Sequence, residues 1–162
     1  MKLTTRGRYA VMAMVDLAAN AAFYADGDEA RVSLPEISER QQISLSYLEQ
    51  LFAKLRRAGL VTSTRGVGGG YSLARAAGDI RVADIIAAVN EDIKTTACDV
   101  QSGKGCLGRS GRCLTHDLWD ELGRHIHIFL NAITLEDVVE KRVLGAASLP
   151  EAPDRDDLRR FM

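Results

Sequence analysis

The chain has 162 residues, 46% of them apolar, which is enough for one globular domain, or a small domain with an appendage, built around a hydrophobic core. No apolar run approaches membrane length and the first residues lack the organisation of a signal peptide, so we expect a cytoplasmic protein without membrane contact. The net charge of -1 gives no overall sign of a nucleic-acid partner, and three cysteines in a cytosolic chain argue against a disulfide framework and favour metal or redox use.

The charge is distributed unevenly along the chain. Residues 1–75 hold 10 Lys and Arg against 7 Asp and Glu, giving +3, whereas residues 76–162 hold 11 against 15, giving -4. A local basic patch matters more for nucleic-acid binding than the total charge. On charge alone, an ordinary solvated surface is the simpler interpretation. The basic residues of the first half that concern us are Lys2, Arg6, Arg8, Lys54, Arg56, Arg57 and Arg65.

The first predicted element is a helix over residues 9–23, apolar on nearly every side and interrupted only by Asp16 and Asn20. A helix of this kind is buried, here between the rest of the chain and a further body such as a second subunit. Arg6 and Arg8 precede it, where an N-terminal arm could contact phosphates. Residues 24–32 form a polar loop.

Two short helices follow, joined by a tight turn. Ser33 and Glu36 can form a capping box for the first helix, which ends near Gln42. Ser44 is a good N-cap for the second helix, and Gly59 ends it. Its core face is predicted to carry Leu45, Leu48, Leu51, Phe52 and Leu55, and its opposite face Ser46, Glu49, Gln50 and Arg57.

A β-hairpin is predicted directly after this helix. Residues 60–64 are a short β-branched run, residues 65–70 are a glycine-rich turn that carries Arg65, and residues 71–73 return as a strand. A polar-faced helix followed by such a hairpin is typical of a winged helix-turn-helix, whose helix enters the major groove of DNA. The predicted DNA contacts are Arg6, Arg8, Ser44, Ser46, Tyr47, Glu49, Gln50, Arg57, Arg65 and Gly66.

Two alternatives concern this region. The glycine-rich turn could cradle a phosphate, but no helix and no Gly-Lys-Ser/Thr sequence follows it, so we reject a nucleotide-binding loop. Ser46 and Glu49 also have the spacing of a capping box. They could therefore cap a helix that starts two residues later, instead of contacting DNA.

The next elements are an amphipathic helix over residues 80–89 and a segment rich in metal-binding side chains. Cys98, Cys106, Cys113 and His116 are separated by seven, six and two residues that are mostly glycine, serine and charged types. Thiolates that converge from a pliable segment suit an iron–sulfur cluster, and histidine can replace one thiolate. Structural zinc is the main alternative, although the C-x₂₋₄-C knuckle of most zinc sites is missing. A third possibility is unliganded cysteines, which the polar neighbours disfavour.

A long helix is predicted from Thr115 to about Ala132, followed by a short helix that starts at Thr134. The long helix is predicted to carry a broad apolar stripe, which we expect to pack against a partner helix. A two-fold homodimer would supply that helix. His125 and His127 lie two apart, so they are expected to be surface or interface residues and not joint ligands. From Gly145 the tail is expected to be disordered. The stripe consists of Leu118, Leu122, Ile126, Phe129 and Ile133, with Trp119 and Leu130 beside it.

Five stretches together resemble the IscR family of iron–sulfur cluster regulators, within a wider family of dimeric winged-helix repressors. They are LTTRGRYAVMAM, ISERQQISLSYLEQLF, LRRAGLVTSTRGVGGGYSL, CLTHDLW and ITLEDVV, and they cover nearly all of residues 1–143. The resemblance implies a [2Fe–2S] cluster held by Cys98, Cys106, Cys113 and His116. It further implies base contacts from Ser46, Glu49 and Gln50, with Arg65 on the wing, and DNA choice that depends on the cluster through Glu49. The cysteine spacings here are longer than those typical of the family.

The expected fold is therefore mainly α with a small β-hairpin wing, a winged helix-turn-helix followed by a long dimerisation helix. We predict a DNA-binding domain over residues 1–75, a cluster-binding and dimerisation region over residues 76–143, and a disordered tail over residues 144–162. The expected function is that of a homodimeric, cluster-sensing repressor of cluster-biogenesis genes on pseudo-palindromic double-stranded DNA, with the cluster assembly machinery as donor. The alternatives are a nitric oxide or iron sensor of the same fold, a zinc-stabilised repressor and an electron carrier. No catalytic arrangement is visible, so an enzyme is not expected.

Overall fold

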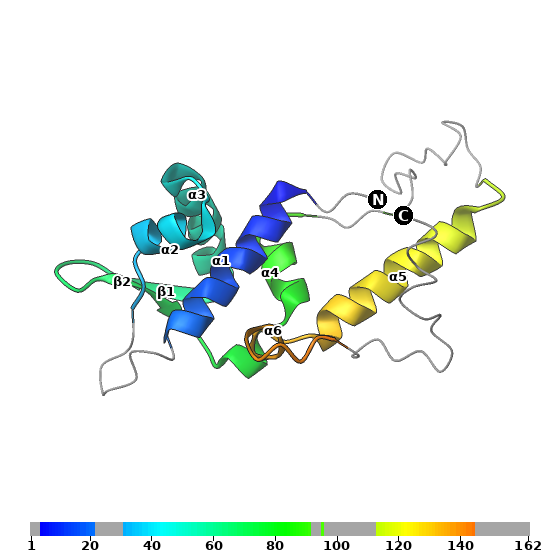
Figure 1. The fold of residues 1–162 in the computed structure, drawn as a ribbon. Helices are drawn as coiled ribbons and strands as arrows, with labels where there is room; N and C mark the ends of the chain where they lie inside the picture. The colour runs from blue at the N-terminus through cyan, green and yellow to red at the C-terminus, as the bar shows by residue number, and fades with distance from the viewer. Residues whose placement is uncertain (1–3, 22–30, 92–94, 96–112, 145–162) are drawn as a thin grey trace.

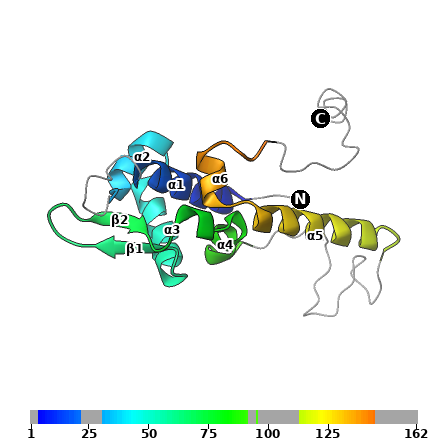
Figure 2. The same ribbon diagram turned by 90° about the horizontal axis from the view of Figure 1, so that it is seen from below.

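The structure is a computed structural model, and it describes residues 4–21, 31–91, 95 and 113–144. Helix α1 (Thr5–Ala21) is followed by α2 (Leu34–Gln41), α3 (Leu45–Arg57) and a hairpin of β1 (Val61–Thr64) and β2 (Gly70–Leu73). A short 3₁₀ helix η2 (Ala77–Asp79), α4 (Val82–Ala88), α5 (His116–Ala132) and α6 (Leu135–Val139) complete the order. Figures 1 and 2 show the hairpin at one end of the molecule and α5 extending from the other.

Helix α1 is the central element of the fold, because it carries much of the core and contacts elements on several sides. It contacts α2, α3, β2, α4 and α6. Its own chain therefore supplies the burial that its apolar sequence requires. The helix begins at Thr5 and not at Tyr9, so Arg6 and Arg8 lie in its first turns and not in a preceding arm. The main core side chains are Ala10, Met14, Leu17, Ile37, Leu48, Leu51, Phe52, Leu55, Leu60, Val61, Ile80, Ile85 and Leu135.

The helix-turn-helix forms as its sequence predicts. Ser33 and Glu36 make the capping box of α2, whose C-cap Gln42 adopts the left-handed conformation with φ 54°. Ser44 is the N-cap of α3, and Gly59, with φ 70°, follows its end. Leu45 is the exception, because it was expected in the core and is 40% exposed. It lies at the first position of α3.

The hairpin pairs β1 with β2 in antiparallel register, Val61 opposite Leu73 and Thr64 opposite Gly70. The strand β2 is fastened to the loop before α2, since Val32 and Tyr71 exchange backbone hydrogen bonds of 2.9 and 2.8 Å. The ring of Tyr71 also lies 4.7 Å from that of Phe52 on α3. The hairpin is thus held beside α3 through β2, while its tip is exposed.

Helix α4 is two residues shorter at its start than the apolar pattern predicts. Arg81 forms an isolated bridge with Thr134, supported by hydrogen bonds from Val82 N to Ile133 O and from Leu135 N to Ile80 O. These long-range bonds hold Ile80 and Arg81 in an extended conformation, which sequence periodicity does not reveal. Helices α5 and α6 follow the predicted bounds, and Thr134 caps α6. No helix in the described ranges is long and apolar enough to cross a membrane.

Candidate nucleic-acid interface and ligand segment

The polar face of α3 is exposed along the length of the helix. Ser46, Glu49, Gln50 and Arg57 all lie on the surface, as does the N-cap Ser44. Tyr47 is half-buried, with its ring edge-on to that of Tyr9 at 6.0 Å. Helix α3 begins at Leu45, so Ser46 and Glu49 lie inside the helix and do not form the capping box that their spacing allows. The face is therefore accessible to a partner.

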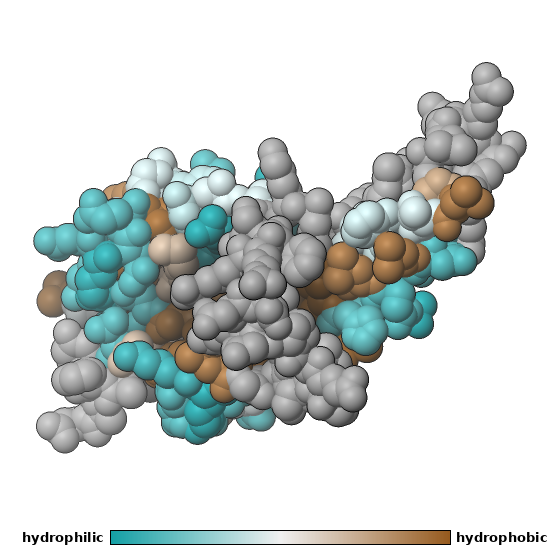
Figure 3. All heavy atoms as spheres, turned by 45° about the vertical axis from the view of Figure 1, so that its right-hand side comes forward, coloured by the Kyte–Doolittle hydropathy of each residue, from teal (hydrophilic) through white to brown (hydrophobic). Residues whose placement is uncertain are grey.

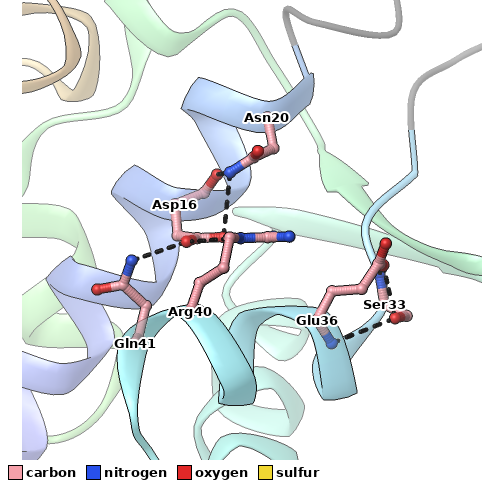
Figure 4. A network of polar contacts seen from close by, with 6 residues as sticks. All are labelled: Asp16, Asn20, Ser33, Glu36, Arg40 and Gln41. Atoms are coloured by element: carbon pink, nitrogen blue, oxygen red, sulfur yellow. Dashed lines mark hydrogen bonds and ion pairs between the residues drawn. The ribbon is translucent and has the colours of Figure 1, made fainter.

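A buried carboxylate on α1 fixes the position of α2. Asp16 is only 3% exposed in its side chain, and it accepts hydrogen bonds from Arg40 Nε at 3.1 Å and Arg40 Nη2 at 2.7 Å. Gln41 Nε2 donates to the same carboxylate at 2.7 Å, and Asn20 Nδ2 donates to the backbone oxygen of Asp16 at 2.8 Å. Figure 4 shows these side chains converging between the two helices. This hydrogen-bond network sets the orientation of the helix-turn-helix relative to α1.

The hairpin tip has a backbone shape that glycine makes possible. Gly66 and Gly68 have φ values of 105° and 74°, a region that other residues rarely adopt. A Cβ atom on Gly69 would stand 2.5 Å from the backbone oxygen of Thr64, so the turn leaves no room for a side chain there. Arg65 and Gly66 are both exposed at this tip. The arrangement presents a cation on a compact, closely fitted turn.

The start of α1 is held by a carboxylate that sequence reasoning missed. Glu91, 8% exposed, accepts hydrogen bonds from the backbone N–H of Thr4, from Thr4 Oγ1 at 2.8 Å and from the Gly7 N–H at 2.5 Å. Burial raises the pKa of Glu91, but these hydrogen bonds and the charge of Arg6 outweigh it and leave the pKa below its usual value. Glu91 therefore caps α1 at Gly7, from 84 residues away in the sequence. Arg6 and Arg8 remain exposed in the turns that it fixes.

The basic residues around α3 are also tied to neighbouring elements. Lys54 Nζ donates to the backbone oxygen of Val89 at 3.2 Å, and Arg56 Nη1 donates to Ser63 Oγ at 3.2 Å. Arg57 Nε donates to the backbone oxygen of Ala53 within the helix at 3.2 Å. The last turn of α3 is thereby joined both to the end of α4 and to β1, which limits its freedom to tilt.

Two of the four predicted cluster ligands lie in the described ranges, at the start of α5. The His116 N–H donates to the backbone oxygen of Cys113 at 3.1 Å, so the two residues share one turn. Cys113 is half-buried, with Sγ 3.5 Å from Thr115 Oγ1, and His116 is buried. Cys98 and Cys106 lie outside the described residues, and the described part of the chain contains no complete group of three metal-binding side chains. A thiol and an imidazole in one turn fit the donor types of an iron–sulfur centre.

Helix α5 carries an apolar face that the described part of the chain leaves exposed. Figure 3 shows this face as hydrophobic patches along the projecting arm. Ile133 is an exception, since it is buried against Val82 and Ile86 in a second small core. His125 and His127 are exposed, as expected for surface or interface residues. The large exposed hydrophobic residues of this helix are Leu118, Trp119, Leu122, Ile128 and Phe129.

The chain matches the Rrf2 family, described as iron-dependent transcriptional regulators, over residues 3–141. The HTH-type transcriptional regulator IscR of Xenorhabdus nematophila is 50% identical over 156 residues, which cover 96% of this chain and 90% of the relative. The solved structure of T. potens IscR superposes with a TM-score of 0.65 at 38% identity and covers 94% of each chain. CymR, the global cysteine regulator of B. subtilis, superposes with a TM-score of 0.70 at 30% identity over 87% of this chain and 98% of CymR. These comparisons confirm the predicted winged-helix fold and a role in transcription, which is not that of an enzyme.

Proposed function

Because the chain belongs to the Rrf2 family of transcriptional regulators, we propose that it represses cluster-biogenesis genes as a homodimer that senses the supply of iron–sulfur clusters. The observation that carries this proposal is the exposed polar face of α3 beside the hairpin, together with Cys113 and His116 in one turn at the start of α5. Many winged-helix proteins share the first feature alone. The second is what an iron–sulfur sensor additionally needs.

The DNA-binding role is assigned to side chains on three elements. Ser46, Glu49 and Gln50 on α3 have the donor and acceptor groups to contact base edges in the major groove. Arg65 at the hairpin tip and Arg57 on α3 supply charge for phosphates or the minor groove. The full proposed set also includes Arg6, Arg8, Ser44, Tyr47 and Gly66. Two such surfaces related by a two-fold axis would favour a pseudo-palindromic operator.

The cluster-binding role is assigned to Cys98, Cys106, Cys113 and His116, which would hold a [2Fe–2S] cluster delivered by the cluster assembly machinery. When bound, the cluster would supply a centre whose loss reports oxidants or scarcity of iron. His116 is buried at the start of α5, so its imidazole is shielded from bulk water. Because the same helix carries the exposed apolar face, we propose that α5 is also the dimerisation helix.

The test is an absorption spectrum of anaerobically purified protein, with iron, sulfide and zinc counted on the same sample. We expect visible charge-transfer bands with about two irons and two sulfides per chain, as a [2Fe–2S] centre requires. His116→Ala should alter the bands, whereas His125→Ala should not, because His125 is exposed and paired with Glu121 at 3.2 Å. Four irons per cluster would point to a nitric oxide or iron sensor, and one zinc per chain would remove the sensing role.

DNA binding is tested separately with duplexes selected from a random library by the cluster-loaded protein. The selected sequences should contain two related half-sites, and the affinity should change when Cys106→Ala prevents cluster binding. A protein that selects no common sequence, or whose affinity is the same with and without the cluster, would contradict the proposed function.

A further inference from the structure

We infer that Glu91 is a positioning residue for DNA binding, and that the turn 89–91 couples the cluster-binding segment to the DNA-contacting surface. The inference is based on contacts made by three consecutive residues, Val89, Asn90 and Glu91. Val89 bonds to the recognition helix α3, while Asn90 and Glu91 bond to the start of α1. The inference rests on the proposed function, since it takes Arg6 and Arg8 as DNA contacts.

The turn has a defined shape, because α4 ends in a helix-termination motif. The Asn90 N–H donates to Ala87 O at 3.0 Å and the Glu91 N–H donates to Ile86 O at 3.4 Å. Asn90 adopts the left-handed conformation that this motif requires, with φ 58°. The backbone oxygens of Val89 and Asn90 accept from side chains on other elements. They form the negative end of α4, which favours cationic partners.

Two cations from the DNA-contacting elements occupy that end. Lys54 Nζ donates to Val89 O at 3.2 Å, and Arg6 Nη1 donates to Asn90 O at 3.4 Å. Lys54 lies four residues after Gln50, so the two side chains are neighbours on α3. Arg6 is itself among the proposed phosphate contacts. A movement of the turn would therefore shift both elements together.

Glu91 provides the strongest of these ties. Its carboxylate accepts two backbone N–H groups and one hydroxyl at the positive end of α1. Those amides lie in the first turn and just before it, where α1 itself offers them no acceptor. Without the carboxylate this turn would fray, and Arg6 and Arg8 would lose their fixed positions. Apart from the charge of Arg6, which helps to lower the pKa of Glu91, the carboxylate acts on the proposed DNA contacts through this turn.

The same turn opens directly into the segment that contains Cys98 and Cys106. Thr95, described between them and the turn, lies against α5, because a Cβ atom on Gly123 would stand 2.4 Å from Thr95 Oγ1. The chain thus runs from the capped start of α1, through Glu91, to the helix that begins with His116. Cys98 follows Thr95 by three residues in the sequence, so a ligand held at Cys98 would act on a chain anchored at Glu91 and at Thr95. The proposed coupling runs through these two anchors.

The test compares Glu91→Gln with wild type in the full-length protein, cluster-loaded and cluster-free, on the library-selected duplex. The amide keeps the size of the side chain but removes its charge and replaces one of its two acceptor oxygens by an NH₂ donor, so that oxygen's partners at the start of α1 lose their acceptor. We expect the slope of log affinity against log salt to become shallower by about four for the proposed dimer, because two phosphate contacts in each of its two chains lose their positions. We also expect the ratio of loaded to empty affinity, about tenfold or more in wild type, to fall toward one.

Asp137→Asn is the matched control. The Asp137 carboxylate also accepts from a threonine hydroxyl and from a backbone N–H at a helix start, both of Thr134, but it caps α6, away from the first turn of α1. It should lower stability and leave both the salt slope and the affinity ratio unchanged. Amide hydrogen exchange gives a second readout without DNA, in which the Gly7 amide should lose protection in Glu91→Gln and keep it in the control.

The outcomes separate the inference from the proposed function. A wild-type salt slope in Glu91→Gln would overturn the positioning role, and a shallower slope with an unchanged affinity ratio would support positioning and overturn the coupling. If wild type itself binds DNA equally with and without the cluster, the sensing function fails and the coupling fails with it. The salt slope of the cluster-free protein would still decide the role of Glu91.

Discussion

Substituting Asp16 by alanine is the most direct test of how the helix-turn-helix is held against α1. The carboxylate accepts from two nitrogens of Arg40 and one of Gln41, and its side chain is 3% exposed. Removing one partner of a fully buried ion pair costs about 3–5 kcal/mol. Arg40 is 36% exposed and can turn toward water. We therefore expect a cost of about 2–3 kcal/mol.

For a chain of this length, that loss corresponds to a fall in the unfolding midpoint of roughly 5–10 °C. It is measured by thermal and urea unfolding followed by circular dichroism. Asp120→Ala is the control, because Asp120 is 59% exposed and pairs with Arg124 only at 3.8 Å. Its loss should cost about 0–0.5 kcal/mol.

A double-mutant cycle with Arg40→Ala decides the cause of the loss. If the network acts as described, Asp16→Ala should cost at least about 1 kcal/mol less when Arg40 is already absent. Equal costs in the two backgrounds would refute the assignment of the stabilisation to this pair, and would leave the volume lost at a buried site as the cause.

Three further predictions concern single substitutions. Leu122→Glu places a charge on the exposed apolar face of α5 and should convert the proposed dimer to monomers, as measured by sedimentation. Gly69→Ala forces a Cβ atom to within 2.5 Å of Thr64 O and should weaken DNA binding at least about tenfold while leaving the unfolding midpoint almost unchanged. Ser33→Ala should cost about 1 kcal/mol at pH 7 through the lost cap. Hydrogen bonds from Ser33 lower the pKa of Glu36, so this cost should shrink as pH falls below the ordinary value of 4.5.

Each of these predictions has a matched control. Asp120→Ala lies on the opposite face of α5 from Leu122 and should leave the sedimentation coefficient unchanged. Gly78→Ala meets only the flexible end of Glu136 at 3.3 Å, so it should not affect DNA binding. For Ser33→Ala, the control is the same urea titration at pH 7 and pH 4. A deficit that stays constant between them would contradict the role given to the Glu36 carboxylate, which stabilises the fold above its unfolded pKa and loses that effect on protonation.

Local sequence signals predicted most of the fold correctly. The capping pair Ser33–Glu36 gave the start of α2, Gly59 gave the end of α3, and the start of α6 was expected at Thr134. These signals work because each helix end is satisfied by residues close in sequence. The glycine-rich stretch likewise indicated the hairpin tip, where positive φ values leave few other choices.

The errors in the bounds of helices occurred where the backbone is satisfied by a group that lies far away in the chain. Helix α1 begins four residues earlier than its apolar pattern suggested, since its cap comes from Glu91. Residues Ile80 and Arg81 are extended, since they pair with the segment around Thr134. Neither partner can be found from periodicity, which reports only which face of an element is buried. The sequence predicted the candidate site least completely, because Glu91 and Lys54 show no local pattern that separates them from ordinary surface charges.

The two buried carboxylates, Asp16 and Glu91, hold different parts of the DNA-contacting surface in place. Asp16 joins α1 to α2, and through the short turn to α3, whereas Glu91 joins the start of α1 to the end of α4. Because α1 takes part in both ties, loosening Asp16 should free α3 while Arg6 and Arg8 keep their positions, and loosening Glu91 should do the reverse. Asp16→Ala should therefore lower the sequence preference and reduce the salt slope only by the share of Arg57 on α3, whereas Glu91→Gln should reduce the salt slope and keep the sequence preference.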